Sequence, residues 1–457
     1  MYEINFRKPE HVHFIGIGGI SMSGLAEVLL DAGFLVSGSD TKESELTKRL
    51  SEKGAEITIG QKAENIRLPL DCIVYTAAIR PDNPEFVSAV ESQVPMLTRA
   101  QLLGQIMRNY KTPIAVAGTH GKTTTTSMLA QVFLSAGLDP TVSVGGILPA
   151  IGGNIRVGSS GTFVTEACEY TNSFLSFFPK IAMILNVEED HMDFFKDLDD
   201  IANSFNRFAG LVPEDGTVII SRNNSCFEKV TDGIKGSLVT FSLTEPADYT
   251  ASDVSFDEFG CGCFTCLERG SSLGHFSLKV PGIHNISNAL AVIACSRVLG
   301  LEPDIIRKGF EQFTGAERRF EYKGTYNGAV IIDDYAHHPS EIRATLNAAA
   351  NYPHKKLIVA FQPHTYTRTK AFLDDFAKVL SAADQVLLAD IYAAREKNTI
   401  GISSADLVDK INAAGGNAEY YESFEKIISK LKESLKEGDL LITMGAGDIY
   451  EVGEALL

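Results

Sequence analysis

Residues 118–126 read Gly-Thr-His-Gly-Lys-Thr-Thr-Thr-Thr, and they lie between an apolar, strand-like run at 114–117 and a run with helical periodicity. A glycine-rich loop between a strand and a helix presents backbone N–H groups and the positive end of the helix dipole to an anion. Lys122 would add a mobile positive charge for the β- and γ-phosphates, and Thr123 would add a hydroxyl for magnesium. The general phosphate-loop pattern has a glycine where Val116 stands, so the match is incomplete. The strand and helix context nevertheless predicts an α/β domain that binds a nucleoside triphosphate.

The size and charge of the chain restrict its class. Its 457 residues are enough for about three domains. The net charge of −17 disfavours nonspecific binding of nucleic acid. No apolar stretch is long enough to span a bilayer, and residues 1–10 lack the apolar core of a signal peptide. We therefore expect a cytoplasmic protein without membrane insertion, while the sequence leaves the oligomeric state open.

Seven cysteines in a chain of this length are sparse, and we expect them to be reduced. Cys261, Cys263 and Cys266 lie close together with His275 downstream, and three sulfurs with a histidine could hold zinc. Their spacing is not a standard zinc pattern, so we favour a cluster without metal. One tightly held zinc per purified chain would overturn this expectation.

A second glycine turn marks the first module of the chain. A short apolar strand at 12–15 leads into a turn and helix start that read Gly-Ile-Gly-Gly-Ile-Ser-Met-Ser-Gly, and a second strand at 34–39 ends in Asp40. This βαβ opening with a distal acid is typical of dinucleotide-binding domains. The strict G-x-G-x-x-G pattern fails at its third glycine, which is Ser21. From the residues alone, two interpretations stay open: NAD binding by an oxidoreductase, and a turn that merely packs a helix on a strand.

In the second module, polar residues follow the strands near the phosphate loop. The run at 162–165 ends in Glu166, and the run at 181–185 is followed closely by His191. Ligands of open α/β sheets bind beyond the carboxyl ends of the strands, where Lys122 is also predicted to lie. A carboxylate and an imidazole near a triphosphate fit magnesium binding or charge balance. Helix capping or burial would explain each residue alone, but the three together favour function.

Two segments follow in the same module. The strand-rich stretch 217–281 predicts a peripheral antiparallel excursion. A long helix is predicted from residue 282 to 299, and polar side chains at its start could face an adenine ring or cap the helix.

The third module repeats the pattern of a strand followed by a polar cluster. Strands at 329–332, 357–361 and 440–444 precede Asp-Asp-Tyr-Ala-His-His-Pro, Gln-Pro-His-Thr-Tyr-Thr-Arg and Gly-Ala-Gly-Asp. Helical runs between such strands indicate a parallel, doubly wound sheet. We therefore predict an α/β protein of three domains. These are a Rossmann-like N-terminal domain at 1–110, a central P-loop ATPase-like domain with the β-rich excursion at 111–314, and a Rossmann-like C-terminal domain at 315–457.

In this order the motifs resemble the Mur ligase family, the ATP-dependent amide ligases that build the peptidoglycan stem peptide. The resemblance covers essentially the whole chain, and the ordered set of motifs is more specific than any one of them. The set consists of GIGGISMSGLA at 16–26, GTHGKTTTT at 118–126, EACEY at 166–170, DH at 190–191, GIHNISNALA at 282–291, ERRF at 317–320, DDYAHHPSE at 333–341, QPHTYTRT at 362–369 and GAGD at 445–448.

The resemblance implies an enzyme that joins L-alanine to the carboxylate of UDP-N-acetylmuramate through an acyl phosphate, with ATP and Mg²⁺ as cofactors. The motifs DDYAHHP and QPH point to alanine as the amino acid. The alternative within the family is a recycling ligase that adds a preformed tripeptide to the same sugar nucleotide. In either case the first glycine turn would hold the UDP end without NAD.

The same resemblance implies roles for individual residues. The catalytic set would be Lys122, Glu166, His191 and His337, the last of which could keep the amine of alanine deprotonated. ATP would be bound by Gly118, Thr119, His120, Gly121, Lys122, Thr123, Thr124, Asn285, Asn288 and Arg319. The UDP-sugar would be bound by Gly16, Gly18, Gly19, Ser21, Met22 and Asp40. L-Alanine would be bound by Tyr335, His337 and Arg368, and magnesium by Thr123, Glu166 and His191.

One residue departs from the family pattern, which commonly reads Gln-Pro-His-Arg-Tyr. Thr365 stands at the position of that arginine. Arginine binds carboxylates with two parallel hydrogen bonds and a charge, neither of which threonine replaces. We therefore expect either that Arg368 contacts the amino acid alone or that the amino acid is bound less tightly.

Overall fold

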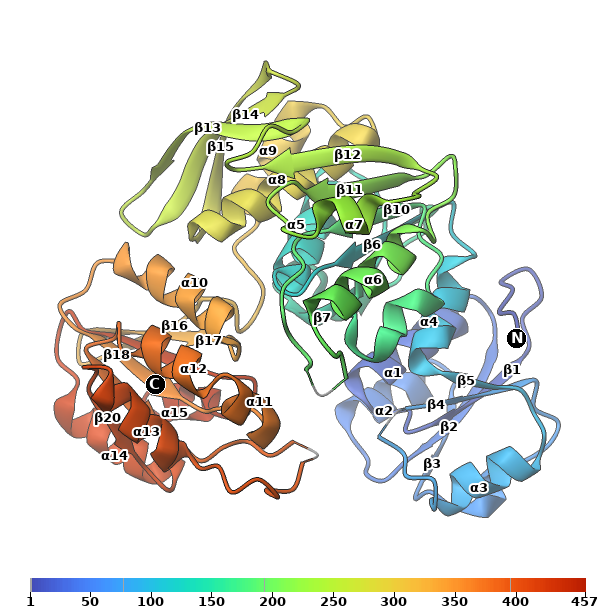
Figure 1. Ribbon diagram of the computed structural model, residues 1–457. Coiled ribbons are helices and arrows are strands. Elements are labelled where there is room, and N and C mark those ends of the chain that lie inside the picture. The colour runs from blue at the N-terminus through green and yellow to red at the C-terminus, as the bar shows by residue number, and fades with distance from the viewer. Residues whose placement is uncertain (1, 77, 193, 395) are drawn as a thin grey trace. The chain divides into compact units, whose positions relative to one another are not determined.

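The computed structural model describes residues 2–76, 78–192, 194–394 and 396–457. Open α/β sheets with helices on their faces make up the fold (Figure 1), which confirms the predicted fold class. The chain forms two compact units. The first contains Met1–Glu188, Leu198–Phe241 and Ala294–Leu301, and the second contains Glu189–Asp197, Ser242–Ile293 and Glu302–Leu457.

The first sheet belongs to the first unit and is parallel throughout, with strand order β3-β2-β1-β4-β5. The order reverses at β1, and a crevice for ligands forms at such a point beyond the carboxyl ends of the strands. The glycine turn directly follows β1. The strands are β1 (His11–Ile15), β2 (Leu35–Asp40), β3 (Glu56–Ile59), β4 (Cys72–Tyr75) and β5 (Met96–Thr98), and the helices are α1 (Ile20–Asp31), α2 (Glu45–Glu52), η1 (Ala63–Asn65), α3 (Pro84–Glu91) and α4 (Arg99–Met107).

The second sheet of the first unit has the order β12-β11-β10-β6-β9-β7-β8 and is parallel except for the β7–β8 pair. The phosphate loop follows β6, between β10 and β9. The strands are β6 (Thr112–Ala117), β7 (Thr141–Leu148), β8 (Gly153–Arg156), β9 (Thr162–Ala167), β10 (Ile181–Ile184), β11 (Thr217–Ser221) and β12 (Ser237–Ser242). The helices are α5 (Lys122–Ser135), η2 (Pro149–Ile151), η3 (Tyr170–Ser176), α6 (Leu198–Ala209) and α7 (Phe227–Thr231).

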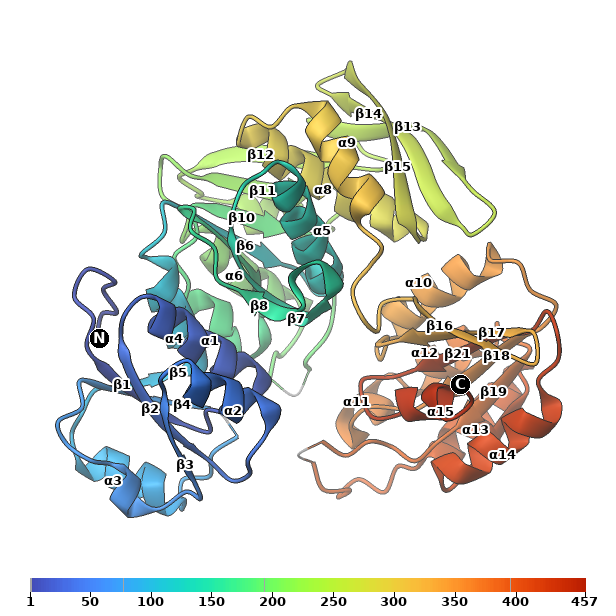
Figure 2. The same cartoon turned by 180° about the vertical axis from the view of Figure 1, so that it is seen from behind.

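The prediction of an antiparallel excursion over 217–281 is partly wrong. β11 and β12 pair in parallel with their neighbours, and α7 forms the crossover between them. Only β13 (Tyr249–Phe256), β14 (Cys261–Glu268) and β15 (Ser271–Pro281) are antiparallel. The helices α8 (Ile283–Val298) and α9 (Pro303–Gln312) follow, and they appear beside these strands in Figures 1 and 2.

The third sheet has the order β16-β17-β21-β18-β19-β20, and only the edge strand β16 is antiparallel to its neighbour. The strands are β16 (Glu321–Tyr326), β17 (Ala329–Asp334), β18 (Leu357–Phe361), β19 (Gln385–Leu388), β20 (Ala418–Tyr420) and β21 (Leu440–Met444). The helices are α10 (Pro339–Ala350), α11 (Tyr366–Ala371), α12 (Leu373–Leu380), α13 (Ser404–Ala413), α14 (Phe424–Ser434) and α15 (Tyr450–Glu454).

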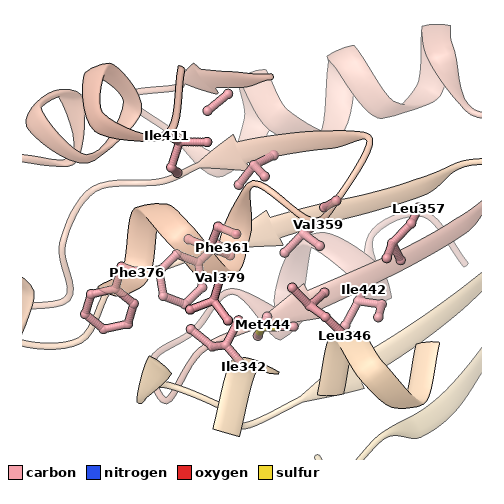
Figure 3. Packing of buried hydrophobic residues seen from close by; sticks show 14 of the residues in the cluster. Ile342, Leu346, Leu357, Val359, Phe361, Phe376, Val379, Ile411, Ile442 and Met444 are labelled. Atoms are coloured by element: carbon pink, nitrogen blue, oxygen red, sulfur yellow. The ribbon is translucent and has the colours of Figure 1, made fainter. Parts of the chain in front are cut away.

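Alternate residues of each strand supply the two cores of the third sheet. Val359 and Phe361 pack with Ile342 of α10 and Phe376 of α12 in the cluster of Figure 3. Ile358 packs on the other face, against residues of α14 and α15. Each fully buried large apolar side chain stabilises the fold by roughly 1.5–3 kcal/mol. Because both faces are covered, the polar clusters are confined to the strand ends.

One close approach inside the first unit explains a glycine of the first motif. A Cβ on Gly24 of α1 would lie 2.8 Å from the side chain of Ile155 of β8, so only glycine allows α1 to pack at this distance. Among the described residues, no helix is long and apolar enough to cross a membrane.

Candidate functional site

The loop between β6 and α5 is shaped by two glycines and one asparagine. Gly118 and Gly121 have φ values of 149° and 83°, which side chains disfavour. Asn186, directly after β10, accepts the N–H of His120 at 2.8 Å through Oδ1 and donates Nδ2 to the carbonyl of His120 at 3.1 Å. Its own carbonyl accepts the N–H of Thr119 at 3.2 Å. No role was predicted for Asn186, although its position just after a buried strand is typical of a ligand-site residue.

Lys122 begins α5 and pairs with Glu169, which the sequence analysis also missed. Its Nζ donates to the two carboxylate oxygens of Glu169 at 3.0 and 3.3 Å and to the carbonyls of Gly118 and Thr119. The side chains of Lys122 and Glu169 are 17% and 3% exposed. Burial acts to lower the pKa of Lys122, but the nearby carboxylate of Glu169 and lesser contributions from its neighbours raise it overall. The ammonium is therefore charged at the N-terminus of the helix.

Glu166, the predicted metal ligand at the end of β9, lies beside the same loop. It is in register with Val116 of β6, and its charge contributes to the raised pKa of Lys122. Its Oε1 accepts the N–H of Gly145 at 2.5 Å, and a Cβ on Gly145 would lie 2.8 Å from Oε2. Thr123 is buried in the first turn of α5. The first unit thus brings together Lys122, Thr123 and Glu166, as the motifs predicted.

The first glycine turn is held by β2. Gly16 has φ 84°, and the N–H groups of Gly16 and Ile17 donate to the carbonyl of Ser39, both at 2.9 Å. Gly18 donates its N–H to Oδ2 of Asp40 at 2.8 Å. Asp40 therefore shapes the turn from inside, and its predicted contact with the sugar nucleotide stays a prediction.

The start of α1 is suited to an anion. Its N-cap, Gly19, has no side chain that could cap the helix, and no acidic residue lies in the first turn. Ser21 is exposed, whereas the side chain of Met22 is 2% exposed and lies in the core. A predicted contact of Met22 with a ligand would therefore have to come from its backbone N–H.

The second unit gathers Tyr335, His337, His364, Arg368, Asp190 and Glu341, which we call the histidine–arginine cluster. Nδ1 of His337 lies 3.0 Å from the carbonyl of Tyr335 and 3.2 Å from the carboxylate of Glu341. Both partners accept hydrogen bonds, so the proton of the neutral ring is on Nδ1 and the lone pair is on Nε2. Burial lowers the pKa of His337 although the charge of Glu341 opposes this, so the ring is mostly neutral at pH 7.

Arg368 connects the cluster to the segment that carries His191. Its Nη2 donates to Oδ1 of Asp190 at 3.1 Å, and its Nη1 donates to Nδ1 of His364 at 3.1 Å. Burial would raise the pKa of Asp190, but the charge of Arg368 and smaller contributions from His191, His338 and the N–H of His191 together outweigh burial and hold that pKa well below its ordinary value. Burial and the charges of His337 and Arg368 lower the pKa of His364 to about 4. Asp190 and His364 lie within the motifs DH and QPHTYTRT, but no role was predicted for either residue.

His191 adopts a backbone conformation that is uncommon for a residue with a side chain, with φ 52°. Its N–H donates to Oδ1 of Asp190 at 2.7 Å, and its Nε2 lies 3.7 Å from Oδ2. It belongs to the second unit, whereas the other two predicted metal ligands, Thr123 and Glu166, belong to the first.

Two arginines pack on the ring of Tyr335. The guanidinium carbons of Arg318 and Arg319 lie 5.0 and 4.9 Å from the ring centroid. Nε of Arg318 donates to Asp333 at 2.9 Å, and Arg319 acts electrostatically on Asp334. The predicted nucleotide ligand Arg319 therefore lies beside the predicted alanine residue Tyr335, and Arg318 is a neighbour that the sequence analysis missed.

Asn285 and Asn288, predicted to contact the adenine side, are each 6% exposed at the start of α8. Nδ2 of Asn285 donates to the carbonyl of Pro281 at 2.7 Å, and Nδ2 of Asn288 donates to Oδ1 of Asn285 at 3.1 Å. These bonds organise the turn before the helix. Their role toward a nucleotide stays a prediction.

The three clustered cysteines lie on β14 as free thiols. Cys261 and Cys266 are buried, and burial raises the pKa of each thiol to about 12, which disfavours the thiolate form that zinc requires. In the described part of the chain, no group of three or more His, Cys, Asp or Glu side chains could hold a metal ion.

Comparison with known proteins gives matches along nearly the whole chain. Residues 11–111 match the Mur ligase family catalytic domain, residues 116–296 the Mur ligase middle domain, and residues 318–447 the Mur ligase glutamate ligase domain. The UDP-N-acetylmuramate–L-alanine ligase of Agathobacter rectalis is 56% identical over 457 residues, which is 100% of both chains. The enzyme of that name from Caldanaerobacter subterraneus subsp. tengcongensis is 52% identical and covers 100% of this chain and 99% of its own.

Solved structures agree with these matches. The UDP-N-acetylmuramate–alanine ligase from Thermotoga maritima superimposes with a TM-score of 0.80 at 30% identity, over 98% of each chain. A murein peptide ligase from Psychrobacter arcticus superimposes with a TM-score of 0.70 at 25% identity, also over 98% of each chain.

Burial of Asp334 predicts a pH-dependent stability. Burial raises the pKa of this carboxyl to about 6, although Arg319 and the N–H groups of Ala336 and Phe320 oppose the shift. A folded pKa above the unfolded value near 4 means that stability is lost as pH rises from about 4 to about 6. Between pH 5 and 7.5 we expect the wild type to lose about 1 kcal/mol relative to Asp334→Asn, measured by calorimetry of both proteins. A difference that stays constant with pH would contradict the assignment.

Proposed function

Because this chain belongs to the Mur ligase family, we propose that it joins L-alanine to the lactyl carboxylate of UDP-N-acetylmuramate and converts ATP to ADP and phosphate. The proposal is supported by the names of its full-length relatives. The observation in this chain that carries it is the partly buried, charged Lys122 at the N-terminus of α5, in the loop after a central strand. This arrangement suits a triphosphate.

The chemistry requires activation of a carboxylate, which is a poor acyl donor. The lactyl carboxylate attacks the γ-phosphorus of ATP, a new O–P bond forms, and the bond to ADP breaks. Lys122 and the N–H groups at the start of α5 stabilise the negative charge of the transferring phosphoryl group. The amine of L-alanine then attacks the acyl phosphate, an amide bond forms, and phosphate leaves with the carboxylate oxygen.

Magnesium is the proposed cofactor beside ATP. Thr123, Glu166 and His191 are the proposed ligands. The fit is best supported for Glu166, because Gly145 leaves room for its carboxylate at the end of β9 and carboxylate oxygens suit this hard ion. Bound there, magnesium would neutralise charge on the phosphates.

His337 is the proposed acceptor for the proton of the alanine amine. Its Nδ1 faces two acceptors, so Nε2 carries the lone pair, and its lowered pKa keeps the ring neutral near pH 7. Tyr335 and Arg368 would complete the alanine site. The glycine turn of Gly16, Gly18, Gly19 and Ser21 would bind the UDP phosphates at the uncapped start of α1.

The remaining predictions fit this scheme as proposals. Asn285, Asn288 and Arg319 would contact the nucleotide, and the domains would divide as 1–110, 111–314 and 315–457. Since ATP and a nucleotide sugar are the substrates, we propose the cytoplasm as the place of the reaction. The nicotinamide oxidoreductase interpretation of the first glycine turn is set aside, because the chain belongs to a family of ligases.

The recycling ligase that adds a tripeptide is the competing function within the family, and the murein peptide ligase from Psychrobacter arcticus has this fold. We expect phosphate release from ATP to require both UDP-N-acetylmuramate and L-alanine, and the tripeptide to replace L-alanine poorly. A colorimetric phosphate assay with each component omitted in turn tests this. Turnover of ATP that is indifferent to the sugar nucleotide would refute the proposal, and preference for the tripeptide would favour the recycling function.

Lys122→Ala tests the phosphate loop. Loss of a charge that would stabilise the transferring phosphoryl group should lower kcat about 10³-fold. The matched control is Lys111→Ala, which removes an exposed lysine from the same unit and should leave kcat unchanged. Near-normal kcat in Lys122→Ala would contradict the assigned role.

A further inference from the structure

The guanidinium of Arg368 already has a carboxylate partner inside the protein. Its Nη2 donates to Oδ1 of Asp190 at 3.1 Å, while Nη1 donates to Nδ1 of His364. The side chains of Arg368 and Asp190 are 10% and 9% exposed, so water and salt screen the pair only weakly. Arg368, which the proposed function assigns to the carboxylate of L-alanine, therefore has a carboxylate partner even when L-alanine is absent.

The charges of the histidine–arginine cluster determine how this pairing affects a carboxylate that enters the site. With neutral histidines, its ionised groups are Arg368, Asp190 and Glu341, which gives a formal charge of 1 − 2 = −1. The arginines packed on Tyr335 have aspartates of their own. A carboxylate that enters this cluster is attracted by Arg368 and repelled by Asp190, whereas an amine is attracted by both acids.

We propose that Asp190 competes with the carboxylate of L-alanine for Arg368 and thereby weakens the binding of the amino acid. The inference rests on the proposed function. It concerns the affinity at that site, because a substrate carboxylate has to take the place of an internal one. The exchange is feasible because Oδ1 of Asp190 also accepts the N–H of His191 at 2.7 Å and keeps this partner when Arg368 turns to the substrate.

Two other roles for the pair predict different results. If Asp190 only stabilised the fold, its removal would lower stability without improving alanine binding. If Asp190 held Arg368 in its working orientation, its removal would raise the KM for alanine. Under competition, removal leaves a buried cation unpaired and lowers the melting temperature, yet alanine binds more tightly.

The test compares L-alanine with L-alaninamide, which has the same amine but no carboxylate, in wild type and Asp190→Asn at saturating ATP and UDP-N-acetylmuramate. We expect the KM for L-alanine to fall about tenfold in the variant, because the substrate carboxylate then pairs with Arg368 without having to displace the carboxylate of Asp190. The KM for L-alaninamide should not fall, because Asp190 attracts an amine rather than repelling it. The ratio of the two kcat/KM values should therefore rise at least about tenfold, and it is insensitive to any effect on kcat that both amines share.

An unchanged or raised KM for L-alanine, or an equal change for both amines, would overturn the proposal. The matched control is Asp374→Asn, an exposed aspartate of the same unit paired with Lys410, and it should leave the ratio unchanged. If Asp190→Asn does not fold, Asp190→Ser removes the same charge and is measured in the same way. A wild type that turns over neither amine would refute the proposed function itself, which separates the two failures.

Discussion

The pairing of Lys122 with Glu169 at the start of α5 is the interaction on which the rest of the site depends. An ammonium that is largely withdrawn from water is destabilised unless it has a partner, and the buried carboxylate of Glu169 supplies one. The left-handed glycines at 118 and 121 bring the loop back over the lysine, and Asn186 fixes the loop through both polar groups of its side chain. The ammonium of Lys122 is therefore charged and held at the helix N-terminus before any substrate binds. Little reorganisation is then required during phosphoryl transfer.

In the second unit, too, each cation of the site has an internal carboxylate as its partner. Arg318, Arg319 and Arg368 are matched by Asp333, Asp334 and Asp190. In both units an internal carboxylate holds a cation that the proposed reaction directs toward an anion. The net charge of the chain is −17, and these internal pairs place individual cations where the proposed substrates carry phosphates and carboxylates.

Many of the candidate site residues could be predicted from the sequence. Ligands of this fold bind at strand ends, and the ends of apolar strands can be recognised in a sequence. The loop around Lys122, the glycine turn before α1, and Tyr335, His337 and Arg368 all follow apolar runs. The partners could not be predicted in the same way. Glu169 and Asp190 lie far from Lys122 and Arg368 in sequence. The pairing of β6 with β9 brings Glu169 to Lys122, whereas Asp190 and Arg368 follow strands of different sheets and meet only in the folded chain. The parallel pairing of β11 and β12 was missed because short strands with a polar crossover look like an antiparallel meander.

The central claim is that the lactyl carboxylate is activated by phosphoryl transfer at the Lys122 loop. UDP-N-acetylmuramate labelled with ¹⁸O in both carboxylate oxygens tests it directly, because an acyl phosphate passes one of these oxygens to the phosphate that leaves. Mass spectrometry of the released phosphate should find one ¹⁸O atom per phosphate formed and one retained in the amide product. Unlabelled phosphate released together with the amide product would contradict the mechanism and with it the assigned role of the loop.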